Sequence, residues 1–383
     1  MILAPEHRGR LVTRFPSVQL SYQVVMTQSI EDLIKLWDGQ AVVTHYDAPT
    51  GTWIFIAIHD LTLGMGCGGC RMKVYPTPAD GLRDAMRLAR GMTHKWAAVD
   101  MDFGGGKTVL AVPRILHGKE REELFRHLGR VLNTLNGSYG TGQDLGTTPD
   151  DFSILAEETK WVFVGDASRG FHVDPGPYTA LGVFSCMKAA CRKVFGNEAL
   201  AGRRVLIQGV GGVGRPLATM LKDAGAGIVL ADLDQQKARA LAEELGAEVV
   251  SNDVVPDTEC DILAPCAVGA TLNRETIPRL ACRAVVGSAN NQLETAADAD
   301  LIHERGILYA PDYVVNAGGA IAFGMMHRGQ TAEEDIRGRI VGVAQSLDDI
   351  LEHAEEHGES PVYGANRKVE QVLAQHREAG AGV

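Results

Sequence analysis

The spacing of apolar residues changes character near the middle of the chain. In the N-terminal half, strand-like runs at 41–45 and 52–59 flank the turn sequence Asp47-Ala-Pro-Thr-Gly51, a pattern that predicts paired strands. Apolar residues then recur at i, i+3, i+4 and i+7, which predicts a helix over 77–90 with one buried face. A further strand is predicted at 70–75. These patterns therefore predict a mixture of strands and helices in the N-terminal half.

From Pro177 onward, short apolar runs alternate with amphipathic segments. The predicted strands are 204–208, 227–231, 247–250, 261–264, 283–287 and 306–309, and the clearest helices between them are 213–224 and 235–245. Alternation of this kind is typical of a parallel sheet with crossover helices. Two more helices, 333–357 and 366–378, have no strand between them, and we expect the last of them to pack back on the first half.

The length of 383 residues exceeds one typical hydrophobic core, so two α/β domains are expected. We predict a first domain over 1–163, a second over 164–359, and C-terminal helices over 360–383 that return to the first. Residues 1–25 show little periodicity and are predicted to be an extension.

The net charge of −11 disfavours nucleic acids and anionic membranes as partners, because an acidic surface repels phosphates. No apolar run approaches the roughly 18 residues of a membrane span, and residues 1–15 lack the apolar core of a secretion signal. An odd number of cysteines, seven, indicates reduced thiols. These features predict a cytoplasmic protein.

Cys67-Gly-Gly-Cys70 has the spacing of half a zinc or redox site. A zinc ribbon needs a second such pair, and the sequence has none. Because the pair precedes a predicted strand and does not open a helix, we interpret it as two small loop cysteines and expect no metal. A metal protein built on Cys67 and Cys70 remains the alternative.

The predicted strand 204–208 leads into Gly209-Val-Gly211-Gly212-Val213-Gly214, which opens a helix. This is the G-x-G-x-x-G arrangement in the context that dinucleotide binding requires, with the pyrophosphate at a helix N-terminus. The next strand ends in Asp232, whose carboxylate would accept hydrogen bonds from a ribose diol and repel a 2′-phosphate. The motif therefore predicts NAD as cofactor in preference to NADP.

Two lysines and an aspartate lie in glycine-rich segments of the first half. Lys95 follows the predicted helix, Lys107 follows the three glycines 104–106, and Asp144 lies in 139–148, which we interpret as a loop. Three glycines before a lysine imply close backbone approach and a buried amine, whose lowered pKa suits proton transfer near neutrality. On residue types alone, solvated lysines and an aspartate that caps a turn remain the alternative.

Five segments occur in consistent order: Arg90-Gly-Met-Thr-His-Lys95, Gly104-Gly-Gly-Lys107, Gly142-Gln-Asp144-Leu-Gly, Ala264-Pro-Cys266-Ala and Asn316-Ala-Gly-Gly319. Together they resemble the Glu/Leu/Phe/Val dehydrogenase family, most closely its leucine, valine and phenylalanine branch. The resemblance implies an N-terminal substrate domain, a Rossmann domain, an active site in the cleft between them and a homo-oligomer. It also implies reversible, NAD-dependent oxidative deamination of an apolar L-amino acid to a 2-oxo acid and ammonia.

The resemblance also assigns roles to single positions. Lys107 and Asp144 match the catalytic lysine that activates water and the aspartate that exchanges protons with the amino group. Lys95 matches the lysine that binds the substrate carboxylate. Three further positions match residues that line the substrate carboxylate or lie near substrate and nicotinamide: Gly68, Gly69 and Asn291. The remaining positions match residues near the cofactor: Thr179, Ala264 and Cys266.

The side-chain pocket is predicted from departures from leucine dehydrogenases. Thr52, Gly142 and Ala320 fall where larger aliphatic residues are usual, while Phe323 partly refills the space. A wider pocket would favour aromatic substrates, so a tryptophan-dehydrogenase-like enzyme that makes an aromatic amino acid is one alternative. A non-catalytic NAD-binding sensor is another, although a sensor has no physical need for both lysines and the aspartate.

Overall fold

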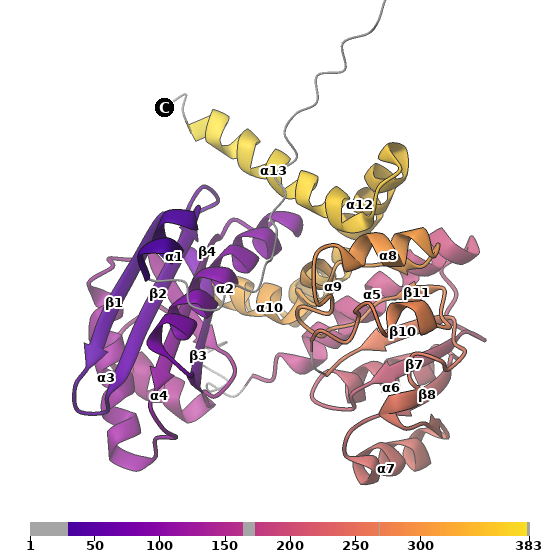
Figure 1. Cartoon of the computed structure of the whole chain (residues 1–383), viewed down its shortest axis with the longest axis horizontal. Coiled ribbons are helices and arrows are strands. Elements are labelled where there is room, and N and C mark those ends of the chain that lie inside the picture. Colours follow the sequence, from indigo (N-terminus) through magenta and orange to yellow (C-terminus); the bar gives the residue numbers. More distant parts are fainter. Residues whose placement is uncertain (1–29, 164–172, 268, 381–383) are drawn as a thin grey trace, which may run out of the picture.

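The computed structural model describes residues 30–163, 173–267 and 269–380. The predicted extension over 1–25 lies outside the described residues. Within them the chain forms two six-stranded sheets, each with its own helices, and the last helix spans the two parts (Figure 1). This arrangement confirms the two-part α/β fold that the sequence predicts.

The first sheet has the strand order β1-β2-β4-β3-β5-β6. Its strands are β1 (Ala41–Asp47), β2 (Thr52–Asp60), β3 (Gly66–Val74), β4 (Gly104–Val112), β5 (Tyr139–Gln143) and β6 (Val162–Phe163). The pairs β1–β2 and β2–β4 are antiparallel, whereas β3 to β6 run parallel. The site described below crosses these parallel strands, with Gly69 and Lys107 inside β3 and β4 and Asp144 directly after β5.

A short helix, α1 (Ile30–Leu36), precedes this sheet. The helices that cover it are α2 (Pro78–Ala98), α3 (Gly118–Asn133) and α4 (Pro149–Glu158). The apolar stripe predicted on α2 is buried against β2 and β4, in a core cluster with Phe55 and Val109. Both α2 and α4 begin with a capping box and a proline, at Thr77 and Thr148. Such caps satisfy backbone N–H groups that the first turn leaves without partners.

Three glycine-rich segments predicted as loops, or as the approach to a strand, are strands in the structure. Cys67, Gly68 and Gly69 lie inside β3, the glycines 104–106 begin β4, and 139–143 forms β5. The predicted helix that ends near Arg90 also continues to Ala98, so Lys95 lies within it. These predictions were wrong because glycine usually weakens a strand, which favours a loop. Here the missing side chain allows neighbouring layers to pack closely, so the glycines are tolerated within strands.

The second sheet is parallel throughout, with the order β12-β11-β10-β7-β8-β9. Its strands are β7 (Arg204–Gln208), β8 (Gly227–Ala231), β9 (Glu248–Val249), β10 (Ile262–Pro265), β11 (Ala284–Val285) and β12 (Leu308–Tyr309). The helices of this part are α5 (Gly176–Phe195), α6 (Gly214–Asp223), α7 (Gln235–Leu245) and α8 (Asp298–Glu304). This is the doubly wound order in which a dinucleotide binds beyond the carboxyl ends of the strands.

The C-terminal part consists of helices: α9 (Asp312–Val315), α10 (Gly318–His327), α11 (Glu333–Val341), α12 (Val343–His357) and α13 (Pro361–Gly380). The single helix predicted over 333–357 is two helices, divided at Gly342. Figure 1 shows α13 crossing from the second part towards the first, where it packs on α2. Lys368 pairs with Asp100 at 3.1 Å and Arg377 with Asp60 at 2.6 Å.

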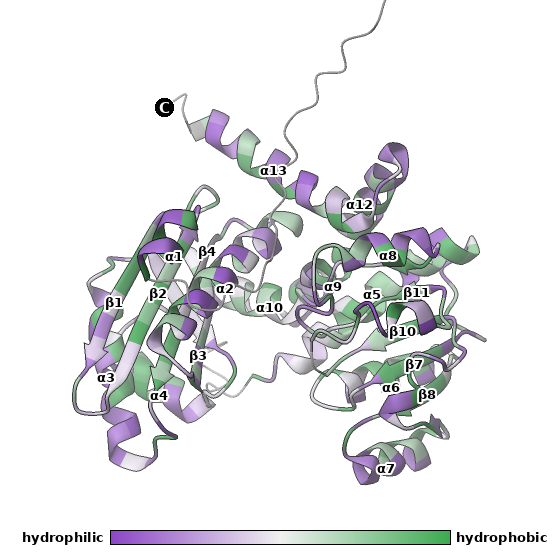
Figure 2. Ribbon diagram, viewed as in Figure 1, coloured by the Kyte–Doolittle hydropathy of each residue, from purple (hydrophilic) through white to green (hydrophobic). Residues whose placement is uncertain are grey.

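Hydropathy follows this layering, with apolar strands inside and hydrophilic faces on outer helices such as α7 and α13 (Figure 2). None of the helices described is long and apolar enough to cross a membrane. All seven cysteines fall among the described residues, and all are unpaired.

Candidate active site

A row of three residues crosses the parallel strands of the first sheet. The register from Cys67 opposite Gly105 to Cys70 opposite Thr108 places Gly69 opposite Lys107, and Gly69 also pairs with Gly142. A Cβ atom on Gly69 would lie 2.7 Å from the Cβ of Asp144 and 3.1 Å from Nζ of Lys107. Gly69 therefore leaves room between two charged groups that any larger residue would push apart.

Lys107 and Asp144 form a direct ion pair, with Nζ 2.5 Å from Oδ2. The lysine is buried, only 6% exposed, although it carries a charge. Burial by itself would raise the pKa of Asp144, but the charges of Lys107 and Arg71 outweigh it and lower that pKa to about 2. Asp144 is therefore ionised at neutral pH and can accept a proton or a hydrogen bond.

A chain of charged side chains connects Asp144 with the second part of the molecule. Arg71 donates from Nε to Asp144 at 3.2 Å and from Nη1 to Asp84 at 3.0 Å. Arg87 donates to the other oxygen of Asp84 at 2.8 Å and to Oδ1 of Asn291 at 3.0 Å. The catalytic candidate and Asn291, predicted near substrate and nicotinamide, thus belong to one hydrogen-bonded network.

Asn291 adopts a positive φ of 53°, an uncommon conformation for a residue with a side chain. The next residue, Gln292, donates its backbone N–H to Oδ2 of Asp312 at 3.2 Å. Gln292 itself is buried and donates from its side chain to the carbonyl of Gly287 at 2.8 Å. These bonds hold the turn that presents Asn291 to the first part.

Lys95 lies in the last turns of α2, partly buried, and its ammonium group makes no hydrogen bond or ion pair with the residues that the structure describes. Burial lowers the pKa of Lys95 to about 8, since the nearby charge of Asp312 offsets the loss of water only in part. Burial also raises the pKa of Asp312. Lys95 feels the charges of Lys107 and Asp144 as well, which places it in the same cluster.

The glycine-rich turn after β7 has the local geometry that its sequence predicts. Gly209 has a φ of 103°, and a Cβ there would lie 2.6 Å from that of Ala267. A Cβ on Gly214 would lie 1.9 Å from the carbonyl oxygen of Gly209, so α6 meets the strand closely. At Gly211 and Gly212, by contrast, a Cβ would meet no atom within 4 Å. Backbone approach to a diphosphate needs this combination of tight ends and an open middle.

Asp232 follows β8 directly and lies against this turn. It accepts hydrogen bonds from the backbone N–H of Val210 at 2.8 Å and from that of Asp234 at 2.9 Å. An ionised carboxylate offers about four acceptor positions, so capacity remains for the two hydroxyls of a ribose. The residues present therefore fit the adenosine half of a dinucleotide.

The other cofactor candidates surround the same turn, with one exception. Cys266 donates its backbone N–H to Gln208 at 2.7 Å, at the carboxyl edge of the sheet. Thr179 accepts from the backbone N–H of Gly319 at 3.2 Å, at the start of α10. The N-terminus of Thr179's helix α5 reaches the turn, because a Cβ on Gly176 would lie 2.2 Å from the carbonyl of Gly212. Ala264 is fully buried within β10, so its side chain serves the core.

Three of the four predicted pocket residues lie near the ion pair or pack on the adjoining core. Gly142 is in the row described above, next to Phe163, and Ala320 and Phe323 on α10 pack against the cluster that contains Phe163. Thr52 is not brought to the site. It begins β2 at the β1–β2 hairpin, where it accepts a hydrogen bond from Thr50 at 2.7 Å.

The position of Thr52 follows from strand register. Ala57 pairs with Lys107, and Thr52 lies five residues before Ala57 on the same strand. Five residues of extended chain span about 16 Å, so Thr52 lies near the far end of the strand. We therefore remove Thr52 from the predicted pocket. Cys67, which directly precedes the glycine pair and packs in the cluster with Phe163, is a better candidate for that role.

Cys67 and Cys70 belong to two different core clusters, as residues three apart on a strand point to opposite faces. Both thiols are buried, and burial raises the pKa of each. Two thiols on opposite faces of a strand do not suit a shared metal ion or an exposed redox pair. Their arrangement favours the interpretation as packing residues.

Sequence reasoning missed Arg71, Arg87 and Asp312. The signal for Arg71 was available, since in a strand it lies on the same face as Gly69, two residues earlier. That signal was lost once Cys67 to Gly69 were taken for a loop. No local pattern points from Arg87 to Asn291, which lies 204 residues later, or from Asp312 to Lys95 in α2.

Comparison with known proteins places the geometry in context. The family model described as "Glu/Leu/Phe/Val dehydrogenase, dimerisation domain" matches residues 49–161, and the one described as "Glutamate/Leucine/Phenylalanine/Valine dehydrogenase" matches residues 230–380. A leucine dehydrogenase from Bacillus cereus is 41% identical over 351 residues, which cover 91% of this chain and 94% of that protein.

A phenylalanine dehydrogenase from Lysinibacillus sphaericus is 39% identical over 347 residues, covering 88% of this chain and 90% of that protein. Among solved structures, an L-tryptophan dehydrogenase from Nostoc punctiforme superimposes with a TM-score of 0.79 at 34% identity. That alignment covers 91% of this chain and all of the other.

Proposed function

Because the chain belongs to the Glu/Leu/Phe/Val dehydrogenase family, an amino acid dehydrogenase family, we propose that it oxidatively deaminates an apolar L-amino acid with NAD. The observation that carries the proposal is the Lys107–Asp144 ion pair beside Gly69, with Lys95 within reach of their charges. The net reaction converts the amino acid, NAD⁺ and water into the 2-oxo acid, ammonium, NADH and one proton.

Each charged residue has a separate task in this proposal. Lys95 binds the substrate carboxylate. This carboxylate is the contact partner that the ammonium group of Lys95 lacks among the described residues. Asp144, which is ionised in the free protein, is the proton acceptor for the substrate ammonium in this proposal. Lys107 orients and activates the water that attacks the imine carbon and stays hydrogen-bonded to Asp144. A bound nicotinamide supplies the hydride acceptor.

NAD is proposed over NADP on the position of Asp232. Its carboxylate is anchored by two backbone N–H groups, so its charge is held where a 2′-phosphate would have to lie. We expect Asp232→Asn to weaken NAD binding and to lower the ratio of kcat/KM with NAD to kcat/KM with NADP. An unchanged ratio of kcat/KM for the two cofactors would remove Asp232 from the ribose site. Asp234→Asn, which keeps both the backbone N–H that Asp232 accepts and a side chain able to cap α7, is the matched control.

For the substrate we propose a leucine- or phenylalanine-type side chain. The relatives with these names are about 40% identical, against 34% for the tryptophan dehydrogenase. Gly142 and Ala320 keep the pocket wide, but the loss of Thr52 from it weakens the argument for large aromatic substrates. We expect Gly142→Ala to reduce kcat/KM more for phenylalanine than for leucine, because a Cβ there would lie 3.3 Å from the carbonyl of Phe163. An equal loss for both would assign Gly142 to the backbone.

The deciding experiment measures NADH formation by the purified chain with a panel of L-amino acids and ammonium release in parallel. Turnover of apolar amino acids with equimolar NADH and ammonium supports the proposal. The non-catalytic sensor predicts NADH binding, for example by fluorescence, without turnover of any amino acid. Asp144→Asn serves as the inactive reference, and binding of NADH to it separates loss of chemistry from loss of fold.

We further propose a cytoplasmic homo-oligomer. The description of the N-terminal family model as a dimerisation domain supports self-association, and seven unpaired cysteines suit a reducing compartment. Analytical ultracentrifugation of the full chain tests the first point, and a sedimentation coefficient of a monomer at micromolar concentration would contradict it.

A further inference from the structure

The end of α12 carries a cluster of metal-ligand side chains outside the site described above. One ring nitrogen each of His353 and His357 and a carboxylate oxygen of Glu356 all lie within 4.8 Å of one another. The spacing i, i+3 and i+4 places the three on one face of the helix. Two imidazoles four residues apart on a helix can hold one ion together, as in helical zinc motifs.

The protonation of His357 favours ligation. Its Nδ1 lies 2.8 Å from the carbonyl oxygen of His353, and a carbonyl oxygen only accepts, so Nδ1 carries the proton. Nε2 then keeps a free lone pair. Metal-binding histidines commonly use one nitrogen in this way to donate to a carbonyl while the other binds the ion.

His353 has unused hydrogen-bonding capacity. Its Nε2 is buried and has no hydrogen-bond partner among the described residues, which is uncommon for a buried polar atom. The two rings face each other, with centroids 4.2 Å apart and planes inclined by 31°. One nitrogen of each ring therefore already lies near the same point, and ligation requires the ring of His353 to present its free nitrogen to the side of His357.

The surrounding charge favours a cation. Glu355 pairs with Lys193 and Glu359 with Arg367, whereas Glu356 forms no ion pair within the described part of the chain. The helix also ends here, at a Gly358 cap with a φ of 62°. The C-terminal carbonyl groups of a helix attract positive charge.

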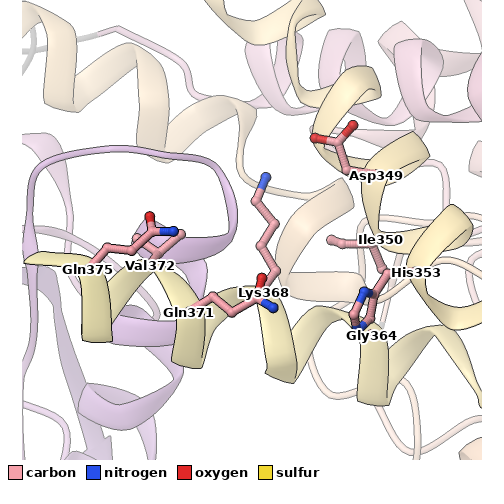
Figure 3. Close-up of a pocket in the computed structure, with 8 residues that line it drawn as sticks. All are labelled: Asp349, Ile350, His353, Gly364, Lys368, Gln371, Val372 and Gln375. Atoms are coloured by element: carbon pink, nitrogen blue, oxygen red, sulfur yellow. The ribbon is translucent and has the colours of Figure 1, made fainter. Parts of the chain in front are cut away.

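The pocket between α12 and α13 restricts the ion to one side of His353. This pocket, of about 240 Å³, is lined by Asp349 and His353 from α12 and by Gly364 and Lys368 from α13, and Figure 3 shows Lys368 extending into the space between the helices. Lys368 is held by Asp100 at 3.1 Å, and its ammonium would repel a cation. The ion therefore belongs on the exposed side, with Glu356 and His357, where water completes its coordination.

We propose that His353, Glu356 and His357 form a binding site for a divalent first-row transition metal ion such as zinc. Imidazole nitrogens with one carboxylate suit zinc, nickel or copper and not magnesium or calcium. Three protein ligands leave the remaining positions to water. The ion bridges the last turn of α12, next to the Gly358 joint from which α13 runs to the first part of the molecule, so binding stabilises this joint.

The experiment titrates zinc into the full-length chain without an affinity tag, by calorimetry and by equilibrium dialysis with metal analysis. We expect one zinc ion per chain and roughly 10²-fold weaker binding for His357→Gln, since loss of one ligand removes the chelate effect. His376→Gln is the matched control, because Nδ1 of His376 also contacts a carbonyl four residues earlier, that of Val372 at 2.9 Å, but no histidine precedes it at that spacing. The control should bind zinc like the wild type.

Glu356→Gln gives a second, exposed substitution that keeps the helix and should weaken zinc binding without changing circular dichroism. Zinc should also raise the melting temperature of the wild type and of His376→Gln, but not that of His357→Gln, because a ligand that binds only the folded state stabilises it. Equal zinc affinity in the wild type, His357→Gln and Glu356→Gln would overturn the proposal, as would a wild type that binds less than one zinc ion per chain.

Discussion

Two lysine–aspartate pairs meet in the candidate active site, and they differ in how they hold their charges. Lys107 touches Asp144 at 2.5 Å, and the pKa of Asp144 falls to about 2. Lys95 and Asp312 influence each other without a hydrogen bond in the described structure, and burial lowers the pKa of Lys95 to about 8 while it raises that of Asp312. One pair is held in its ionic form by direct contact, whereas burial shifts the pKa values of the other two groups towards their neutral forms.

The difference is physical and suits the two proposed tasks. A contact pair supported by Arg71 gains enough Coulomb energy to overcome desolvation, so its charges persist when substrate arrives. A desolvated lysine without a contact partner gains that energy only when an anion binds. The first pair is therefore preorganised for proton transfer, and the second is prepared to recognise a carboxylate.

The largest effect is expected from breaking the contact pair. Lys107→Met should reduce kcat by about 10²- to 10⁴-fold, a typical contribution of a positioned acid–base group, while NADH still binds. Steady-state kinetics and NADH fluorescence measure the two quantities. Lys73→Met, an exposed lysine on the adjacent strand β3, should leave both unchanged. Joint loss of NADH binding and activity would assign Lys107 a structural role.

Removing the support of that pair should have a smaller effect. Arg71→Met takes away one of the charges that lower the pKa of Asp144, so that pKa should rise. A carboxyl group with a lowered pKa stabilises the fold above its ordinary pKa, near 4, and loses this contribution as the pH falls towards 2. We expect Arg71→Met to lower the free energy of unfolding by about 1 kcal/mol at pH 6, and the difference to shrink as the pH approaches 2.

Urea unfolding at several pH values measures this difference, and Arg71→Lys, which keeps the charge, should lie between the two proteins. A destabilisation that does not vary with pH would mean that Arg71 acts through packing alone.

The lowered pKa of Lys95 predicts that the protein takes up a proton when a substrate carboxylate binds. Above pH 8 the free amine of Lys95 is mostly neutral, and a bound carboxylate requires the ammonium form. At pH 9, binding of a 2-oxo acid to the NADH complex should take up about one proton per site, and below pH 7 almost none. Calorimetry in buffers of different ionisation enthalpy measures the uptake. Lys95→Arg, which stays charged, should abolish it, and an uptake that persists in that variant would point to another group.

The smallest effect is expected at Asp312. Its charge is the largest one that raises the pKa of Lys95, so Asp312→Asn should lower that pKa further and start proton uptake at a lower pH. The amide can still accept the N–H of Gln292, which preserves the turn at Asn291. If proton uptake by Asp312→Asn instead begins at a higher pH than in the wild type, the charge of Asp312 does not raise the pKa of Lys95 as proposed.

The amino-acid sequence alone predicted the strands and helices of the second sheet and the glycine-rich turn after β7. The strand 204–208, the helix 235–245 and the tight turn of Gly209 and Gly214 next to Asp232 could be predicted because each depends on residues close to one another in sequence. Lys95, Lys107 and Asp144 were also found in the sequence, through the resemblance, although their predicted surroundings were partly wrong.

Only the tertiary structure decided how the site is assembled. Gly69 lies between Lys107 and Asp144, and Arg71 links Asp144 to Asp84, because three strands that are distant in sequence pair in one register. The same register carries Thr52 away from the site. Strand pairing is a non-local interaction, and a one-residue change of register moves every side chain to the other face. The sequence and its family resemblance therefore identify the candidate catalytic groups, whereas the contacts that set their pKa values arise only when the sheet forms.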